Sequence, residues 1–222
     1  MKYLLAFLFI VPALKSISQS NKVLIKLPPL SLVDEVSFPA IQAGAEFMLT
    51  DKISWYNEVA IKYRKSYYES ADTNFVPSNG FKIKTEARYH LGNNGPIYGR
   101  YLAANIFFIH ESRNTGIGYY YQKDSSMERA DNFGAKRNVF GINLLGGYQH
   151  SFFNRFAFDV YAGIGIRIRS VRTSNKEYDK SRDNLLHAVD LIVNDIRDQA
   201  DADNSYPVLP NLSLGFRLCY RF

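Results

Sequence analysis

A histidine and a serine stand two residues apart, at His110 and Ser112, with Glu111 between them. Residues two apart on a β-strand share one face, so the imidazole and the hydroxyl could lie within reach of each other. A histidine that accepts the hydroxyl proton turns such a serine into a nucleophile for acyl transfer or hydrolysis. We find no carboxylate on the same face of the neighbouring predicted strands to orient His110. The alternative is a rim histidine and a loop serine with no chemical role.

Three aspartates, Asp198, Asp201 and Asp203, could offer oxygen ligands to a calcium ion. The glycine and the terminal glutamate of a calcium loop are missing from this segment. The single cysteine, Cys219, cannot form an intramolecular disulfide. We therefore predict no metal site, no cofactor and no disulfide.

The elements that must position these residues show strict alternation, which is clearest at the end of the chain. There, one face carries large apolar side chains and the other carries small or charged ones. A period of two with these groups is typical of the wall of a transmembrane β-barrel. The same pattern predicts eight antiparallel strands, at residues 23–32, 40–49, 53–64, 80–91, 97–110, 138–150, 156–168 and 211–222.

The connections between these strands alternate in length. Residues 50–52, 92–96 and 151–155 are short, whereas 65–79, 111–137 and 169–209 are long and polar, and 33–39 is a short exception. Outer-membrane barrels have short periplasmic turns and longer external loops, so we place both termini in the periplasm. Within the longest loop, apolar residues recur at helical spacing and predict an external amphipathic helix over residues 181–198. This helix would pack on the barrel rim, or contact lipopolysaccharide or a partner protein.

Aromatic residues at the strand ends predict two interfacial girdles. The periplasmic girdle would contain Phe47, Trp55, Tyr89, Tyr98, Tyr148, Phe156 and Phe222, and the outer one Tyr63, Phe81, Phe108 and Phe140.

The first eighteen residues predict a secretory signal, with Lys2 before an apolar run and small residues before Gln19. Residues 19–222 would then form one barrel domain. The net charge of +6 and the pI near 9.2 could suggest nucleic acid. The lysines and arginines alternate with apolar residues along strands and form no concentrated basic arm, so we expect no nucleic-acid binding.

Charged side chains gather on the predicted inner faces. The lumen of an eight-stranded barrel is just wide enough to be filled by side chains, so we expect no open pore. Because basic residues outnumber acidic ones there, we predict ion pairs at mid-barrel and surplus cations near the mouths. An anion path is the alternative. The predicted network comprises Glu46, Glu58, Lys62, Lys82, Lys84, Glu86, Arg88, Asp159, Arg167 and Arg217.

The signal sequence and three further segments, residues 39–47, 158–167 and 215–222, carry a family resemblance. They resemble small outer-membrane β-barrel proteins of Bacteroidota, many of unknown function, over nearly all of the mature chain. The resemblance implies the outer membrane of a Gram-negative bacterium, with its lipid and lipopolysaccharide as surroundings. It also implies insertion by the barrel assembly machinery, which in such proteins recognises a C-terminal aromatic strand. Leu218, Tyr220 and Phe222 occupy that position here.

Three functional hypotheses follow. The first is a monomeric, non-catalytic barrel that acts in envelope integrity, adhesion or surface recognition, with an extracellular partner at its loops. In the second, His110 and Ser112 resemble the His-x-Ser-Asn element of outer-membrane lipid A deacylases, which are also eight-stranded barrels. Arg113 stands where that family has asparagine, and the strand comes earlier in this chain. The third is a soluble, secreted lipocalin-like barrel with its apolar faces turned inward around a ligand.

Overall fold

The computed structural model describes residues 23–29, 40–62, 78–92, 98–121, 127–153, 155–179, 181–185 and 208–221. The predicted signal sequence, Phe222 and the three candidate calcium ligands lie outside these ranges. The strands are β1 (Val23–Leu27), β2 (Ala40–Met48), β3 (Ile53–Lys62), β4 (Ser78–His90), β5 (Gly99–Tyr120), β6 (Glu128–Ser151), β7 (Phe156–Ser174), β8 (Asn184–Leu185) and β9 (Val208–Arg221).

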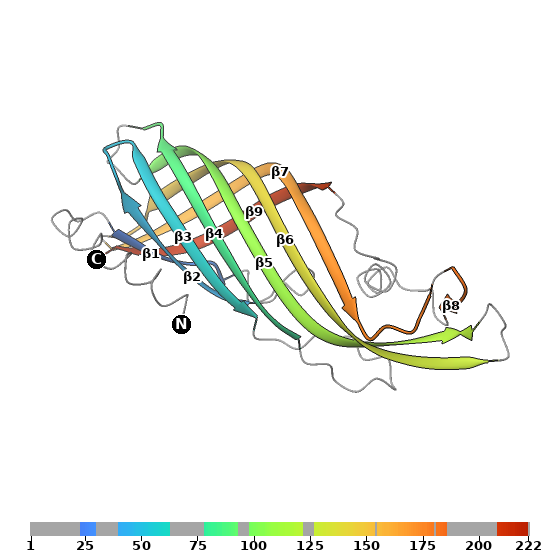
Figure 1. Cartoon of the computed structure of the whole chain (residues 1–222). Helices are drawn as coiled ribbons and strands as arrows, with labels where there is room; N and C mark the ends of the chain where they lie inside the picture. Colours follow the sequence, from blue (N-terminus) through green and yellow to red (C-terminus); the bar gives the residue numbers. More distant parts are fainter. Residues whose placement is uncertain are drawn as a thin grey trace, which may run out of the picture.

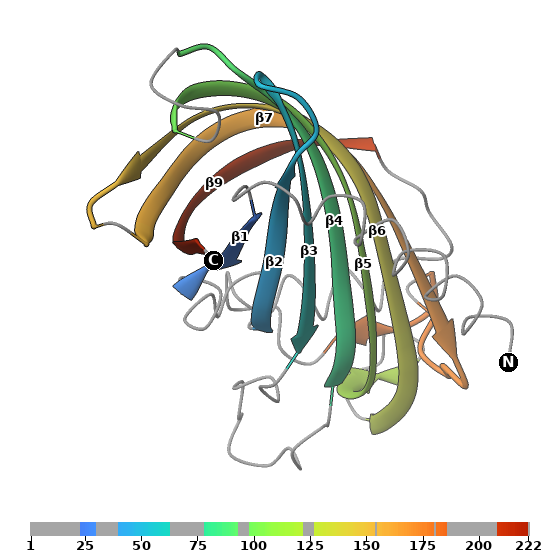
Figure 2. The ribbon, with the colours of Figure 1, turned by 90° about the vertical axis from the view of Figure 1, so that its left-hand side faces the viewer.

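Eight of these strands close into an antiparallel barrel. Each pairs with the next along the chain from β1 to β7, then β7 pairs with β9, and β9 pairs with β1. Figures 1 and 2 show the strands wrapping around one interior, with β1 beside β9. The prediction of an all-β, eight-stranded antiparallel barrel is confirmed. We call the end with the β2–β3, β4–β5 and β6–β7 connections the turn end, and the opposite end the arm end.

The barrel has its apolar side chains outside and its charged side chains inside. Leu212 and Leu214 on β9 are 80% and 79% exposed, whereas Arg217 on the other face of the same strand is 0% exposed. The alternation along each strand produces this result, because successive side chains point to opposite faces of a sheet. A lipocalin-like barrel would need the reverse sidedness.

The strands β5 and β6 are much longer than predicted. They pair without interruption from Gly99 opposite Gln149 to Tyr120 opposite Glu128. The prediction that residues 111–137 form an irregular loop is therefore wrong. The outward residues of this extension are mostly polar or glycine, so the apolar period that marks a strand disappears while the strand continues. In Figure 1 the two strands form an arm that projects past the other barrel strands.

The arm has a small apolar core of its own. Tyr119, Phe133, Ala135 and Tyr178 are all buried and pack together. Asp131, also buried, accepts hydrogen bonds from the backbone amides of residues 177 and 178, at 2.7 and 2.9 Å. The segment that follows β7 is thereby held against the inner face of the arm.

The start of the predicted helix is not helical. Residues 181–182 form a turn, and β8 adds two residues to the edge of β5, opposite Tyr119 and Tyr120. Pairing with β5 therefore overrides the local helical period at this point. The rest of the predicted helix lies outside the described ranges, within which no helix is long and apolar enough to cross a membrane. In the turn, the backbone amide and the hydroxyl of Ser181 donate to Asp179 and lower the pKa of that carboxyl.

The predicted position of Tyr98 in the outward girdle is wrong. Its strand begins only at Gly99, whose φ of 105° belongs to a region that favours glycine. Before that turn, the side chain of Tyr98 packs against a buried apolar cluster of Leu24, Met48, Ala157 and Cys219. This cluster closes the turn end of the interior.

The other described girdle residues lie on the outer face of the barrel. Trp55, Tyr89, Tyr148 and Phe156 are exposed near the turn end, and Phe81, Phe108 and Phe140 are exposed nearer the arm end. Tyr63 and Phe222 lie outside the described ranges.

Candidate functional site

Eight charged side chains meet inside the barrel and form what we call the lumen network. They are supplied by β1, β2, β3, β4, β7 and β9, and each is at most 5% exposed. The network contains four carboxylates and four cations, so its formal charges cancel. Its members are Lys26, Glu46, Glu58, Lys84, Glu86, Arg88, Asp159 and Arg217.

Asp159 receives more contacts than any other carboxylate of the network. Its Oδ2 accepts hydrogen bonds from Lys26 Nζ at 2.8 Å and Arg217 Nη1 at 3.0 Å. Arg88 Nη1 lies 3.0 Å from the same oxygen. The other oxygen, Oδ1, accepts from the Tyr101 hydroxyl at 2.6 Å. Three cations from three different strands therefore depend on one carboxylate on β7.

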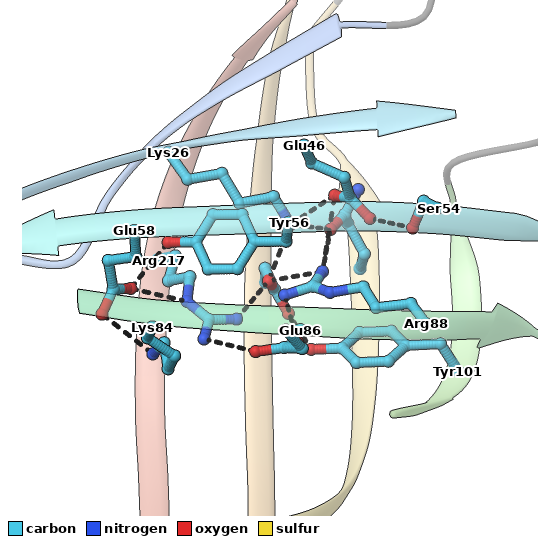
Figure 3. A network of polar contacts seen from close by, with 12 residues as sticks. Lys26, Glu46, Ser54, Tyr56, Glu58, Lys84, Glu86, Arg88, Tyr101 and Arg217 are labelled. Carbon is cyan, nitrogen blue, oxygen red and sulfur yellow. Dashed lines mark hydrogen bonds and ion pairs between the residues drawn. The ribbon is translucent and has the colours of Figure 1, made fainter. Parts of the chain in front are cut away.

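Glu86 and Glu46 connect the remaining cations. Glu86 lies 2.7 Å from Arg88 and 3.2 Å from Arg217, so it bridges the two guanidinium groups. Glu46 lies 2.6 Å from Lys26, and its other oxygen accepts a hydrogen bond from the Ser54 hydroxyl at 2.5 Å. Figure 3 shows this chain of contacts running across the interior. Such mutual pairing offsets the cost of removing ions from water, which is several kcal/mol for each unpaired ion.

Glu58 holds the part of the network that lies nearer the arm end. It lies 2.9 Å from Lys84 and 3.9 Å from Lys82, and it accepts a hydrogen bond from the Tyr56 hydroxyl at 2.6 Å. Lys82 thus sits at the margin of the network, with its side chain 22% exposed.

Tyrosine rings fill the space between the guanidinium groups. Arg88 lies 5.0 Å from the centre of the Tyr56 ring and 4.4 Å from that of Tyr101. Arg217 lies 4.5 Å from the centre of the Tyr56 ring and 3.9 Å from that of Tyr161. These distances are those of cation–π contacts, which strengthen when the cation is desolvated. Tyr56 therefore packs against both arginines, as Figure 3 shows.

Glycines on the inner face make room for these rings. Gly147 lies directly opposite Tyr101, and Gly215 directly opposite Tyr161. A Cβ at either glycine would overlap the facing ring. An aromatic ring that covers a glycine on the next strand is a recognised way to stabilise a curved sheet. The inner glycines are thus part of how the lumen is filled.

Farther toward the arm end, amide groups form a ladder across three strands. Asn143 on β6 donates to Asn105 on β5 at 2.9 Å, and Asn211 on β9 donates to Asn143 at 2.7 Å. Gly165 lies between Asn143 and Asn211 in the pairing register, so no side chain separates the two amides. Beyond this ladder, Glu111 forms ion pairs with Lys62 and, at 2.6 Å, with Arg137.

The structure divides the predicted network into groups. Glu46, Glu58, Lys84, Glu86, Arg88, Asp159 and Arg217 lie in mutual contact, whereas Lys62 pairs with Glu111 near the arm end and Arg167 is exposed. Sequence reasoning missed Lys26, because Pro28 and Pro29 interrupt the alternation of its segment. It also missed Glu111 and Arg137, which it assigned to a loop. Their spacing of two from inner residues of the same strands was the available signal.

His110 and Ser112 lie on the outer face of β5, near the arm end. His110 Nδ1 lies 2.7 Å from Asn138 Oδ1, and its ring centre lies 5.5 Å from that of Phe81. Ser112 faces Asn79 on β4 and Lys136 on β6. If Nδ1 donates to Asn138, then Nε2 is the ring nitrogen that can accept a proton. Among the described residues, no group of three or more histidine, cysteine, aspartate or glutamate side chains could hold a metal ion.

The terminal strand presents Leu218 and Tyr220 on its outer face. Leu218 is 45% exposed, and the Tyr220 hydroxyl accepts a hydrogen bond from Arg155 at 3.2 Å. The Tyr220 ring meets the Phe156 ring edge to face at 5.3 Å. The end of β9 is thus flanked by the aromatic residues of the β6–β7 turn.

Comparison with known proteins adds little. No protein-family profile matches the sequence, and no curated protein matches it. The crystal structure of Acinetobacter baumannii CarO is similar over 90% of this chain and 97% of that chain, with 12% identity and a TM-score of 0.36. A similarity at this level carries no argument about the function of this chain.

Proposed function

We propose that this protein is a non-catalytic outer-membrane barrel with a side-chain-filled lumen, which supports an external arm used in envelope integrity, adhesion or surface recognition. The observation that carries the proposal is the sidedness of the wall. Exposed leucines, isoleucines and phenylalanines cover the outside, while eight paired charges are buried inside. Water would disfavour such an outer surface, whereas lipid is its natural solvent.

The strand lengths support the same proposal. β2 has 9 residues and β3 has 10, and a tilted strand needs about 9 to 11 residues to cross a bilayer. The turn end would face the periplasm and the arm end the exterior, as in barrels with short periplasmic turns. The arm would then stand above the outer leaflet, where its polar outer face meets water.

Cell fractionation combined with gel migration tests this proposal. We expect the protein in the outer-membrane fraction, with faster migration in detergent when it is not boiled, because a folded barrel stays compact. Protease added to whole cells should cleave the arm but leave the barrel strands protected. A soluble periplasmic protein with no shift on boiling would overturn the proposal.

A second candidate is a lipid A deacylase-like hydrolase, favoured by the hydrogen bond between His110 and Asn138. An asparagine orients the catalytic histidine in papain-like proteases, so a carboxylate is not the only group that can do so. In this candidate, His110 Nε2 would take the proton of Ser112 while the hydroxyl oxygen attacks an acyl ester. Incubation of purified protein with lipid A, followed by mass spectrometry, tests it. Release of fatty acid by wild type but not by the Ser112→Ala variant would favour the hydrolase over the non-catalytic barrel.

A further inference from the structure

The outer face of the barrel changes from apolar to cationic within four residues along β6 and β7. At one level, a continuous apolar row crosses five strands, and all of its members are exposed. We call it the apolar row; it consists of Ile83, Phe108, Phe140, Ile168 and Val208. Four residues farther toward the arm end, Lys136 follows Phe140 on β6 and Arg172 follows Ile168 on β7.

Lys136 and Arg172 lie directly opposite each other in the β6–β7 ladder, and both are exposed. Like charges in such a pair repel and destabilise the sheet. An anion placed between them would convert this repulsion into attraction. Ser112 lies opposite Lys136 on β5 and extends the same row, so a hydroxyl donor stands beside the cations.

The height of the pair above the apolar row identifies the anion. Four residues of strand cover about 13 Å, which a tilt of about 40° reduces to a height of about 10 Å. The headgroup region begins where the hydrocarbon ends and is about 5 to 8 Å deep on each side. The two cations therefore lie at the level of lipid phosphates, if the apolar row marks the edge of the hydrocarbon.

We propose that Lys136 and Arg172, assisted by Ser112, bind the phosphate of a phosphorylated glycolipid in the outer leaflet. An arginine fork binds phosphate oxygens in pairs, and lysine adds a point charge. The acyl chains of the same lipid would lie against Phe140 and Ile168 directly below. This inference depends on the membrane location proposed above and assigns a lipid class to one side of the wall, that of β5, β6 and β7.

The test uses the full barrel refolded into phosphatidylcholine nanodiscs that contain bisphosphorylated lipid A. Native mass spectrometry after release into detergent counts the lipid A molecules that stay bound. Two surface cations together contribute about thirty-fold to binding at a lipid surface, so we expect Lys136→Gln/Arg172→Gln to lose at least about ten-fold of the retained lipid A. A matched double variant, Lys52→Gln/Arg155→Gln, removes the same charge near the turn end and should retain as much as wild type.

A second arm uses lipid A from which the phosphates have been removed enzymatically. Wild type should retain it no better than the double variant does. Equal retention of bisphosphorylated lipid A by wild type and Lys136→Gln/Arg172→Gln would overturn the inference, as would equal retention of the phosphate-free lipid by wild type. Each sample is first checked for the migration shift on boiling. A barrel that shows the shift but retains no lipid A refutes this inference alone, whereas a chain that never inserts refutes the proposed function.

Discussion

Asp159 and Arg217 lie directly opposite each other on β7 and β9, and their side chains are joined by a hydrogen bond of 3.0 Å inside the barrel. A slip of the β7–β9 register by one residue would turn Arg217 toward the outer face, because side chains alternate between faces. The pair therefore connects the charge chemistry of the lumen to the register that closes the barrel.

Replacement of Asp159 should destabilise the barrel strongly. In Asp159→Ala, Lys26, Arg88 and Arg217 lose a shared carboxylate while they remain buried. Loss of one partner of a buried ion pair costs about 3 to 5 kcal/mol. The free energy of unfolding, measured by urea titration in lipid vesicles, should fall by about that amount, whereas the exposed control Glu128→Ala should change it by less than about 0.5 kcal/mol. Similar values for both variants would mean that the network contributes little to stability.

Two adjacent glycines should differ sharply in their tolerance of alanine. A Cβ at Gly147 would overlap the Tyr101 ring, whereas a Cβ at Gly146 meets nothing within 4 Å. Overpacking of this kind costs about 1 to 3 kcal/mol, so Gly147→Ala should lower the temperature at which the compact gel band disappears. Gly146→Ala should leave that temperature unchanged. An equal response of the two variants would contradict the packing of Tyr101 against Gly147.

The arm should unfold separately from the barrel. Phe133→Ala removes a buried ring from the arm core, and such truncations cost about 3 to 5 kcal/mol. Because this core lies apart from the lumen network, the migration shift on boiling should persist. Limited trypsin digestion should cleave within residues 111–137 at least several-fold faster than in wild type. The surface variant Glu128→Ala serves as the control, and loss of the migration shift in Phe133→Ala would show that arm and barrel fold as one unit.

The wild-type barrel should not conduct ions. The apolar cluster at the turn end, the lumen network and the amide ladder succeed one another through the interior. In planar lipid bilayers we expect no stepwise current after insertion of purified protein. A stable, anion-selective current would instead support the anion path, and its loss in Arg217→Gln would locate that path in the lumen network.

The sequence by itself determined the fold class, the strand number and the face on which nearly every described barrel residue lies. The reason is that a period of two is a local property, and alternation assigns each side chain to a face without knowledge of its neighbours. Where apolar residues no longer marked one face, as along residues 111–137, the strand continued unrecognised. Tyr98 was misplaced because its parity was read through Gly99, where the backbone turns.

Only the tertiary structure decided which charges meet. Alternation says that Lys62, Lys84 and Arg88 all point inward, but their partners depend on strand register and on height along the barrel axis. Lys84 and Arg88 reach the lumen network, while Lys62 pairs with Glu111, a residue far along the chain on a strand that had no predicted continuation. Register is set by long-range pairing and by the fit of rings against glycines, as for Tyr161 and Gly215, and neither is encoded within one segment.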